Sequence, residues 1–84
     1  MKNLTTSEIA KVIGNQLKIT REEKHLTQEQ VAKAIGCEWK DIEYWERGNM
    51  FPPSLCDLIL LAEYFEVDIN YFTSSVREAM ESDA

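Results

Sequence analysis

The chain has few of the residues that build metal centres, disulfide frameworks or membrane spans. It contains one histidine and two cysteines in 84 residues, and Cys37 and Cys56 are too far apart for a Cys-x-x-Cys pair. This argues against a structural zinc site, and we expect two buried, reduced thiols. No apolar run approaches the ~20 residues of a membrane helix, and the N-terminal stretch lacks the apolar segment of a signal peptide. We therefore expect a cytoplasmic protein without metal or cofactor.

Glycine and proline are also scarce, with three and two residues. A chain this short forms one domain, here residues 1–84, and has no room for a catalytic cleft with a lid. It has no glycine-rich phosphate loop and no His/Cys/Asp constellation, so we do not expect an enzyme. What the chain does contain is 44% hydrophobic and 29% charged residues, which is typical of a globular domain.

The net charge of −6 is unevenly distributed along the chain. Residues 1–48 hold eight Lys/Arg and eight Asp/Glu, whereas residues 49–84 hold Arg77 against seven acids. Any polyanionic partner is therefore expected to meet the N-terminal half, with the acidic half turned away.

Apolar residues recur at helical spacing and no segment alternates like a strand, so the sequence predicts an all-α fold. Thr5, Thr27 and Ser54 each begin a capping box, with Glu, Gln or Asp three residues later. The expected helices cover about residues 6–24, 28–35 and 38–47, then a segment after Ser54 and a short segment from Val67. Residues 74–80 can continue as a sixth helical piece. The fourth helix is the most apolar, through Leu55, Leu58, Ile59, Leu61, Ala62 and Phe65.

Two glycines divide the N-terminal half. Gly14 interrupts the first helix, and a glycine in a helix interior costs ~1 kcal/mol, so residues 1–13 are expected to form an N-terminal arm. Gly36 is the expected left-handed turn between two short helices. We therefore expect an arm at 1–13, followed by a core that contains a helix-turn-helix at 27–47.

Several short motifs occur together in a fixed order. They are Leu26–Ala32 (LTQEQVA), Ile35-Gly36, Ile42, Trp45–Gly48 (WERG), Pro52, the apolar fourth helix and Val67–Phe72 (VDINYF). With these motifs, residues 14–72 resemble the lambda-repressor-like (Cro/repressor, Xre-type) helix-turn-helix family. The resemblance makes 14–72 the expected core and 73–84 a C-terminal extension. The resemblance implies a five-helix DNA-binding domain that meets double-stranded DNA as a homodimer.

The resemblance also implies functional residues, because the family places its third helix in the major groove. Trp39, Lys40 and Tyr44 would face bases, while Gln28, Thr27 and Asn49 would contact phosphate. It further implies an ion pair between Arg21 and Glu46 that locks the reading helix. The full expected DNA-binding set is Thr27, Gln28, Glu38, Trp39, Lys40, Asp41, Glu43, Tyr44 and Asn49, and the expected dimer interface is Phe72, Val76 and Met80.

Each assignment has an ordinary structural alternative. Trp39 and Tyr44 can equally cover the core, Lys40 can be a solvated lysine, and Glu38 can serve the helix N-terminus. Arg21 and Glu46 can be unrelated surface charges. Phe72, Val76 and Met80 can cap the core, and Met50-Phe51 can pack on the fourth helix or meet a partner.

Two functions follow from these observations. The first is a sequence-specific transcriptional regulator, a repressor that binds a near-palindromic operator as a dimer. The alternative is a protein-interaction module on the same fold, such as an antirepressor, an antitoxin-like partner or an inhibitor. Three acids on the third helix, the acidic C-terminal part and the Met50-Phe51 loop motivate this alternative.

Overall fold

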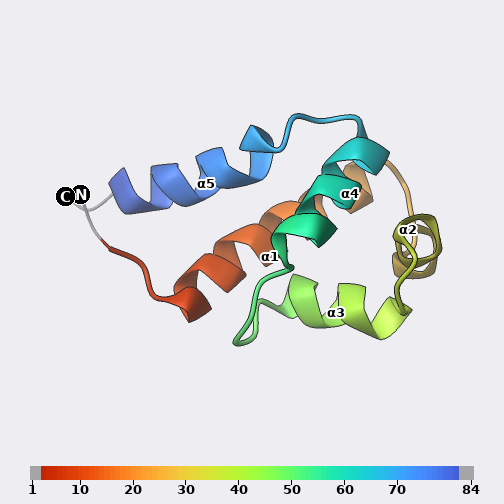
Figure 1. Ribbon diagram of the computed structural model, residues 1–84, viewed down its shortest axis with the longest axis horizontal. Helices are drawn as coiled ribbons and strands as arrows, with labels where there is room; N and C mark the ends of the chain where they lie inside the picture. The colour runs from red at the N-terminus through yellow and green to blue at the C-terminus, as the bar shows by residue number, and fades with distance from the viewer. Residues whose placement is uncertain (1–2, 82–84) are drawn as a thin grey trace.

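The computed structural model describes residues 3–81, which form five α-helices and no strand. These are α1 (Thr6–Glu23), α2 (Gln28–Ile35), α3 (Trp39–Arg47), α4 (Leu55–Phe65) and α5 (Asn70–Glu81). Helix α1 runs through the middle of the molecule, with α5 along one side and α3 along the other (Figure 1). Helix α2 lies at one end, where it contacts α3 and α4. The predicted all-α fold is confirmed.

The helix starts follow the local sequence. In each predicted capping box, the hydroxyl accepts from the backbone N–H three residues on, and the later side chain accepts in return. These reciprocal bonds satisfy N–H groups that have no partner within the helix. The pairs are Thr5 with Glu8, Thr27 with Gln30, and Ser54 with Asp57.

Helix α1 continues through Gly14 without a break, so residues 6–13 belong to it and do not form a separate arm. Ala10 and Ile13 are buried on this part of the helix. The glycine serves tertiary packing instead, because a Cβ at residue 14 would collide with the carbonyl oxygen of Trp45 on α3. The absence of a side chain lets α1 and α3 approach closely. Residues 1 and 2 of the expected arm lie outside the described residues.

The predicted fifth helix and the sixth helical piece are one continuous helix, α5, which packs along α1. The buried Thr20 hydroxyl lies 2.9 Å from the Tyr71 hydroxyl, and Ser75 donates to the side-chain oxygen of Gln16 at 3.2 Å. To residue 81, the expected C-terminal extension is therefore a part of the packed domain. Residues 82–84 lie outside the described part.

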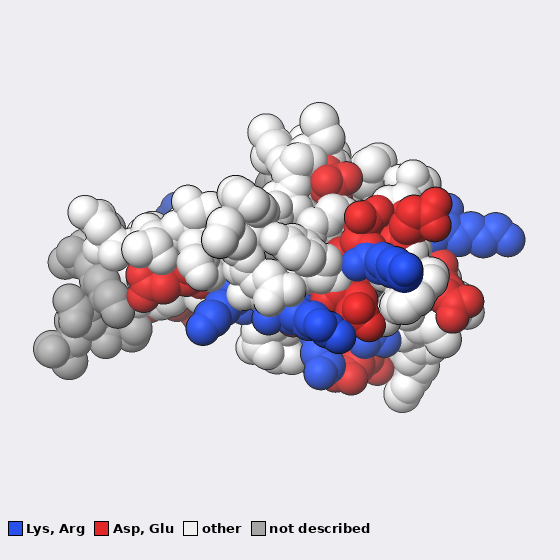
Figure 2. Space-filling model, turned by 90° about the horizontal axis from the view of Figure 1, so that it is seen from below, with Lys and Arg blue, Asp and Glu red and all other residues white. Residues whose placement is uncertain are grey.

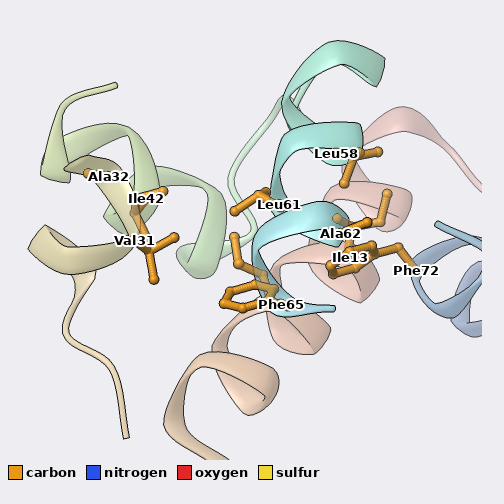
Figure 3. Close-up of a cluster of buried hydrophobic side chains, with 10 residues drawn as sticks. Ile13, Val31, Ala32, Ile42, Leu58, Leu61, Ala62, Phe65 and Phe72 are labelled. Carbon is orange, nitrogen blue, oxygen red and sulfur yellow. The ribbon is translucent and has the colours of Figure 1, made fainter. Parts of the chain in front are cut away.

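The core is a single cluster to which all five helices contribute (Figure 3). Leu17, Val31, Ile42, Leu61, Phe65 and Phe72 have no exposed surface. Helix α4 presents Leu58, Leu61, Ala62 and Phe65 to this cluster, whereas Leu55 and Ile59 of the predicted apolar stripe are exposed. Burial of each large apolar side chain contributes about 1.5–3 kcal/mol.

The expectation of two buried cysteines is wrong for Cys56. Cys56 lies on the outward side of α4 and is exposed, whereas Cys37 is half-buried against the core. Burial raises the pKa of the Cys37 thiol, and the nearby carboxylates of Asp41, Asp57 and Glu38 add to that shift.

Arg21 and Glu46 meet between α1 and α3. The Nε of Arg21 donates to Glu46 Oε2 at 2.6 Å and its second guanidinium nitrogen donates to Glu46 Oε1 at 2.9 Å. The two side chains are only 12% and 4% exposed. The hydrogen bond to Glu46 raises the pKa of Arg21, against the opposing effect of burial. Arg21 also donates to the carbonyl oxygen of Leu26 at 2.8 Å, and Gln28 donates to Glu46 at 3.0 Å. The pair thus joins α1, the α1–α2 turn, α2 and α3.

Removing the Arg21 cation should destabilise the fold strongly. Arg21→Met leaves the shielded Glu46 carboxylate without its cation, and we expect a loss of about 2–4 kcal/mol in the free energy of unfolding. The matched control is Arg47→Met, because Arg47 pairs with Glu43 at 3.6 Å in an exposed position. That change should cost no more than about 1 kcal/mol. Urea unfolding followed by circular dichroism measures both, and equal losses for the two variants would contradict a special role for Arg21.

Candidate nucleic-acid interface

Helices α2 and α3 are joined by a tight turn at Gly36. This residue has φ of 79°, in the left-handed region, and both its N–H and that of Cys37 donate to the carbonyl oxygen of Ala32 at 2.9 Å. Ala32 is buried where the two helices cross. Because glycine reaches positive φ at little cost, the sequence sets the angle at which α3 leaves α2.

The outward face of α3 carries the three residues expected to face bases. Trp39 is 42% exposed and Tyr44 is 37% exposed, so neither is a core residue. Lys40 is exposed, and its ammonium lies 5.9 Å from the centre of the Trp39 ring. An indole, a phenol and a cation thus share one accessible surface, while Ile42 anchors the opposite side of the helix in the core.

The three acids expected near this face have different environments. Asp41 accepts from the backbone N–H of Glu38 at 3.0 Å and so caps the start of α3. Glu43 pairs with Arg47 one turn later. Glu38 is the N-cap residue of α3 and forms the capping box together with Asp41, and it is exposed. The carboxylates of Asp41 and Glu43 are therefore engaged with their own helix.

An open hollow of about 630 Å³ lies between the start of α2 and the end of α3. Thr27 and Gln28 border it, at the positive end of the α2 dipole. Lys18 and Arg47 also border it, as do Glu29 and Glu43. Gln28 is half-buried because its amide is bonded to Glu46, so the expected phosphate contact begins from an anchored side chain. Lys18 and Arg47 are not among the DNA-binding residues predicted from the sequence. The i, i+4 spacing of Glu43 and Arg47 is nevertheless typical of an ion pair on a helix.

Asn49 and the loop after it are accessible. Asn49 is exposed directly beyond Gly48, which ends α3 in the left-handed region. Met50 and Phe51 are 62% and 59% exposed and therefore do not pack onto α4. Pro53 is buried and holds the far end of the loop to the domain.

The charges on the α3 side of the molecule are mixed. Figure 2 views this side and shows Lys and Arg interspersed with Asp and Glu, beside a broad area without charged residues. Contact with a polyanion on this face thus depends on individual cations and on how tightly each is held by a neighbouring acid.

The three residues expected at a dimer interface do not form one exposed surface. Phe72 is fully buried in the core, and Val76 packs against that cluster from α5. Met80 is half-buried near the end of the same helix. Phe72 therefore contacts its own chain.

The described residues contain no cluster of His, Cys, Asp and Glu suited to a metal ion. Within the same part of the chain, every helix is too short or too polar to cross a bilayer.

A comparison with protein families matches most of the chain to a known family. The profile described as helix-turn-helix covers residues 17–72, about two thirds of the chain, and includes α2, the Gly36 turn, α3 and α4. A comparison with curated proteins gives no match. The matched range contains the Arg21–Glu46 pair, the tight turn and the exposed face of α3. The chain therefore belongs to the helix-turn-helix family of the lambda-repressor (Xre) type, whose members are DNA-binding regulators.

Proposed function

We propose that this protein is a sequence-specific transcriptional regulator of the cytoplasm that binds double-stranded DNA as a homodimer and represses by occluding its operator. The observation that carries the proposal is the exposed face of α3, with Trp39, Lys40 and Tyr44 held outward by the Arg21–Glu46 pair. A short helix with a fixed orientation and an accessible polar face is what reading of the major groove requires.

Each outward side chain has a role that suits a base or a phosphate. Lys40 supplies a point charge that reaches guanine O6 and N7, and Trp39 beside it offers apolar contact to a thymine methyl. Tyr44 donates a hydrogen bond from its hydroxyl to a phosphate or a base edge. Glu38 is exposed at the start of α3 and can accept from cytosine N4. Asp41 acts indirectly, by capping the helix that presents these groups.

Phosphate contacts would come from the hollow beside α3 and from the loop after it. The first amide groups of α2, with Thr27 and Gln28, form an anion site at a helix N-terminus. Arg47 borders the same hollow but is paired with Glu43 at 3.6 Å. An exposed pair of this kind is worth at most about 1 kcal/mol, so a phosphate can take Glu43's place. Asn49 adds a contact just beyond the same C-terminal end of α3.

The acidic C-terminal half suits this orientation. Between Arg47 and Arg77 the sequence has no basic residue, so α4 and the loop after it repel DNA and leave the α3 side as the approachable one. Two copies would read half-sites about 34–36 Å apart, which gives a near-palindromic operator.

The alternative function is a protein-interaction module without DNA binding. The exposure of Met50 and Phe51 favours it, because two large apolar side chains in a loop form a contact surface. Both functions use the same fold, so a binding experiment must separate them.

Selection from random duplexes at two salt concentrations tests the proposal. We expect a near-palindromic sequence to be recovered and its affinity to fall steeply with salt.

On that site, Lys40→Ala should weaken binding by about 1–3 kcal/mol and relax the preference at one base pair. Gln28→Ala should weaken binding about equally on all duplexes, because phosphate carries no sequence information. If the selection enriches no duplex even at low salt, the DNA-binding function is contradicted and the protein-interaction module is the function that stands.

Release of Arg47 from its acidic partner should strengthen DNA binding. Glu43→Gln removes a charge that both repels phosphate and holds Arg47. Because an exposed ion pair contributes up to about 1 kcal/mol, we expect the variant to bind DNA several-fold more tightly at low salt. The matched control is Glu63→Gln, which makes the same charge change on the exposed surface of α4. Fluorescence anisotropy with a labelled duplex measures both variants. If the two gain equally, net charge rather than the α3 surface governs binding.

A further inference from the structure

The loop that follows α3 is fixed at both ends and apolar between them. At its start, Gly48 is buried against α1, where a Cβ would lie 2.7 Å from the Cα of Lys11. At its end, Pro53 is buried, and the ring of each proline fixes the backbone angle φ. Between these points, Met50 and Phe51 are 62% and 59% exposed. Two large apolar side chains therefore project into water from a restrained backbone.

This loop lies on the same side of the molecule as α3. We call residues 49–53 the apolar loop, because none of them is charged. In Figure 1 it is the green loop that leaves the end of α3 and reaches the lower edge of the molecule, along which α3 also lies. Figure 2 views the molecule from this edge and shows a broad area without charged residues beside the Lys and Arg side chains. A duplex that meets α3 on this side therefore meets the apolar loop next to it.

The length of α3 determines where the apolar loop lies on DNA. The nine residues of α3 rise about 13 Å, and the major groove is about 12 Å wide. A helix of this motif places its N-terminal residues on the base edges, so Trp39 lies in the groove and Gly48 at its sugar–phosphate wall. A chain spans at most about 3.5 Å per residue, so Phe51 reaches up to about 10 Å past Gly48. This distance carries the side chain across one strand to the neighbouring minor groove.

The chemistry of the apolar loop suits the minor groove better than the phosphates. The loop has no cation to neutralise a phosphate, and Met50 or Phe51 against one would displace water without returning a hydrogen bond. Phenylalanine, methionine and proline are among the side chains with which minor-groove proteins separate neighbouring base pairs. Asn49, the phosphate contact proposed above, would hold the start of the loop on the strand between the two grooves.

We propose that the apolar loop inserts Phe51 between two base pairs from the minor groove, with Met50 beside it, and kinks the operator there. This inference rests on the proposed function, since α3 must occupy the major groove for the loop to reach this base step. Insertion removes the stacking of one step and in exchange takes two exposed apolar side chains out of water. The kinked step thus covers the surface that the free protein leaves exposed.

Insertion also gives the operator a sequence preference at a step that α3 does not read. Pyrimidine–purine steps, TA and CA/TG, kink and unstack more easily than other steps, whereas runs of A·T pairs without them are stiff. We therefore expect a pyrimidine–purine step beside each half-site, at the flank that meets the end of α3. Lys40 and Trp39 set the sequence within the half-site, and Phe51 sets it at this step.

Bending of the selected duplex tests the insertion. A duplex of about 30 bp that contains the recovered sequence is labelled at its two ends with a fluorescence donor and acceptor. We expect the wild-type protein to bend it by about 20–90°, and Phe51→Ala to lose most of the bend and bind several-fold more weakly. The matched control is Ile59→Ala, which removes an exposed apolar side chain from α4 and should leave bend and affinity unchanged. Circular dichroism should show that both variants are folded.

Exchange of the base step tests where the loop inserts. Replacing the pyrimidine–purine step by AA should weaken binding of the wild-type protein several-fold and hardly change binding of Phe51→Ala, which has no ring to insert. Permanganate, which oxidises unstacked thymines, should react at this step in the wild-type complex and not in the Phe51→Ala complex. Phe51→Lys should also lose the bend, whereas a loop that lies on the phosphates would bind more tightly with this variant and leave the bend unchanged.

Three results would overturn the inference. A bound duplex that stays straight, or one that Phe51→Ala bends as much as the wild-type protein does, removes the insertion and leaves the regulator intact. If the selection enriches no duplex, the insertion falls together with the regulator, and Met50 and Phe51 then serve a protein partner.

Discussion

The orientation of α3, and of the exposed Trp39, Lys40 and Tyr44 on it, depends on the carboxylate of Glu46. It accepts from Arg21 of α1 and from Gln28 of α2, while its own backbone belongs to α3. Helix α3 has only nine residues and would not be stable alone in water. Its direction is set by this junction, by the left-handed turn at Gly36 and by the close approach to α1 that Gly14 permits. Loss of the junction would leave an exposed face with no fixed relation to DNA.

The acids of α3 illustrate why a count of charges describes this surface poorly. Asp41 satisfies an N–H at the start of the helix, and Glu43 is held by Arg47. Both carboxylates thus have local partners, and the helix would lose stability or solubility without them. The pair with Arg47 is weak and exposed, so its guanidinium can change partner when a phosphate arrives. An acidic recognition helix is therefore compatible with DNA contact through exchange of partners.

Local rules predicted much of the fold from sequence. The three capping boxes and the Gly36 turn depend on residues within a few positions of one another, and each appears in the structure. The reason for Gly14 could not be found that way, because it is the carbonyl oxygen of Trp45, about thirty residues along the chain. The exposure of Cys56 and the burial of Phe72 likewise depend on which side of a helix its neighbours cover. The Arg21–Glu46 pair was predicted only by the family resemblance, because the two residues are far apart in the sequence and neither position identifies the other as its partner.

Sequence also could not predict which side of α4 is covered. The apolar composition of this helix indicates burial but does not identify the elements that bury it. A small domain buries a modest share of its surface, so its most apolar helix can have one face in the core and another outside. Leu58, Leu61 and Phe65 are buried and contribute fully to folding, whereas Leu55, Ile59 and Tyr64 contribute less because part of each side chain stays exposed. An exposed polar residue at those three positions would leave the core unchanged and make the monomer more soluble. Folding therefore accounts for the inward side of α4 and not for the apolar residues on its outward side.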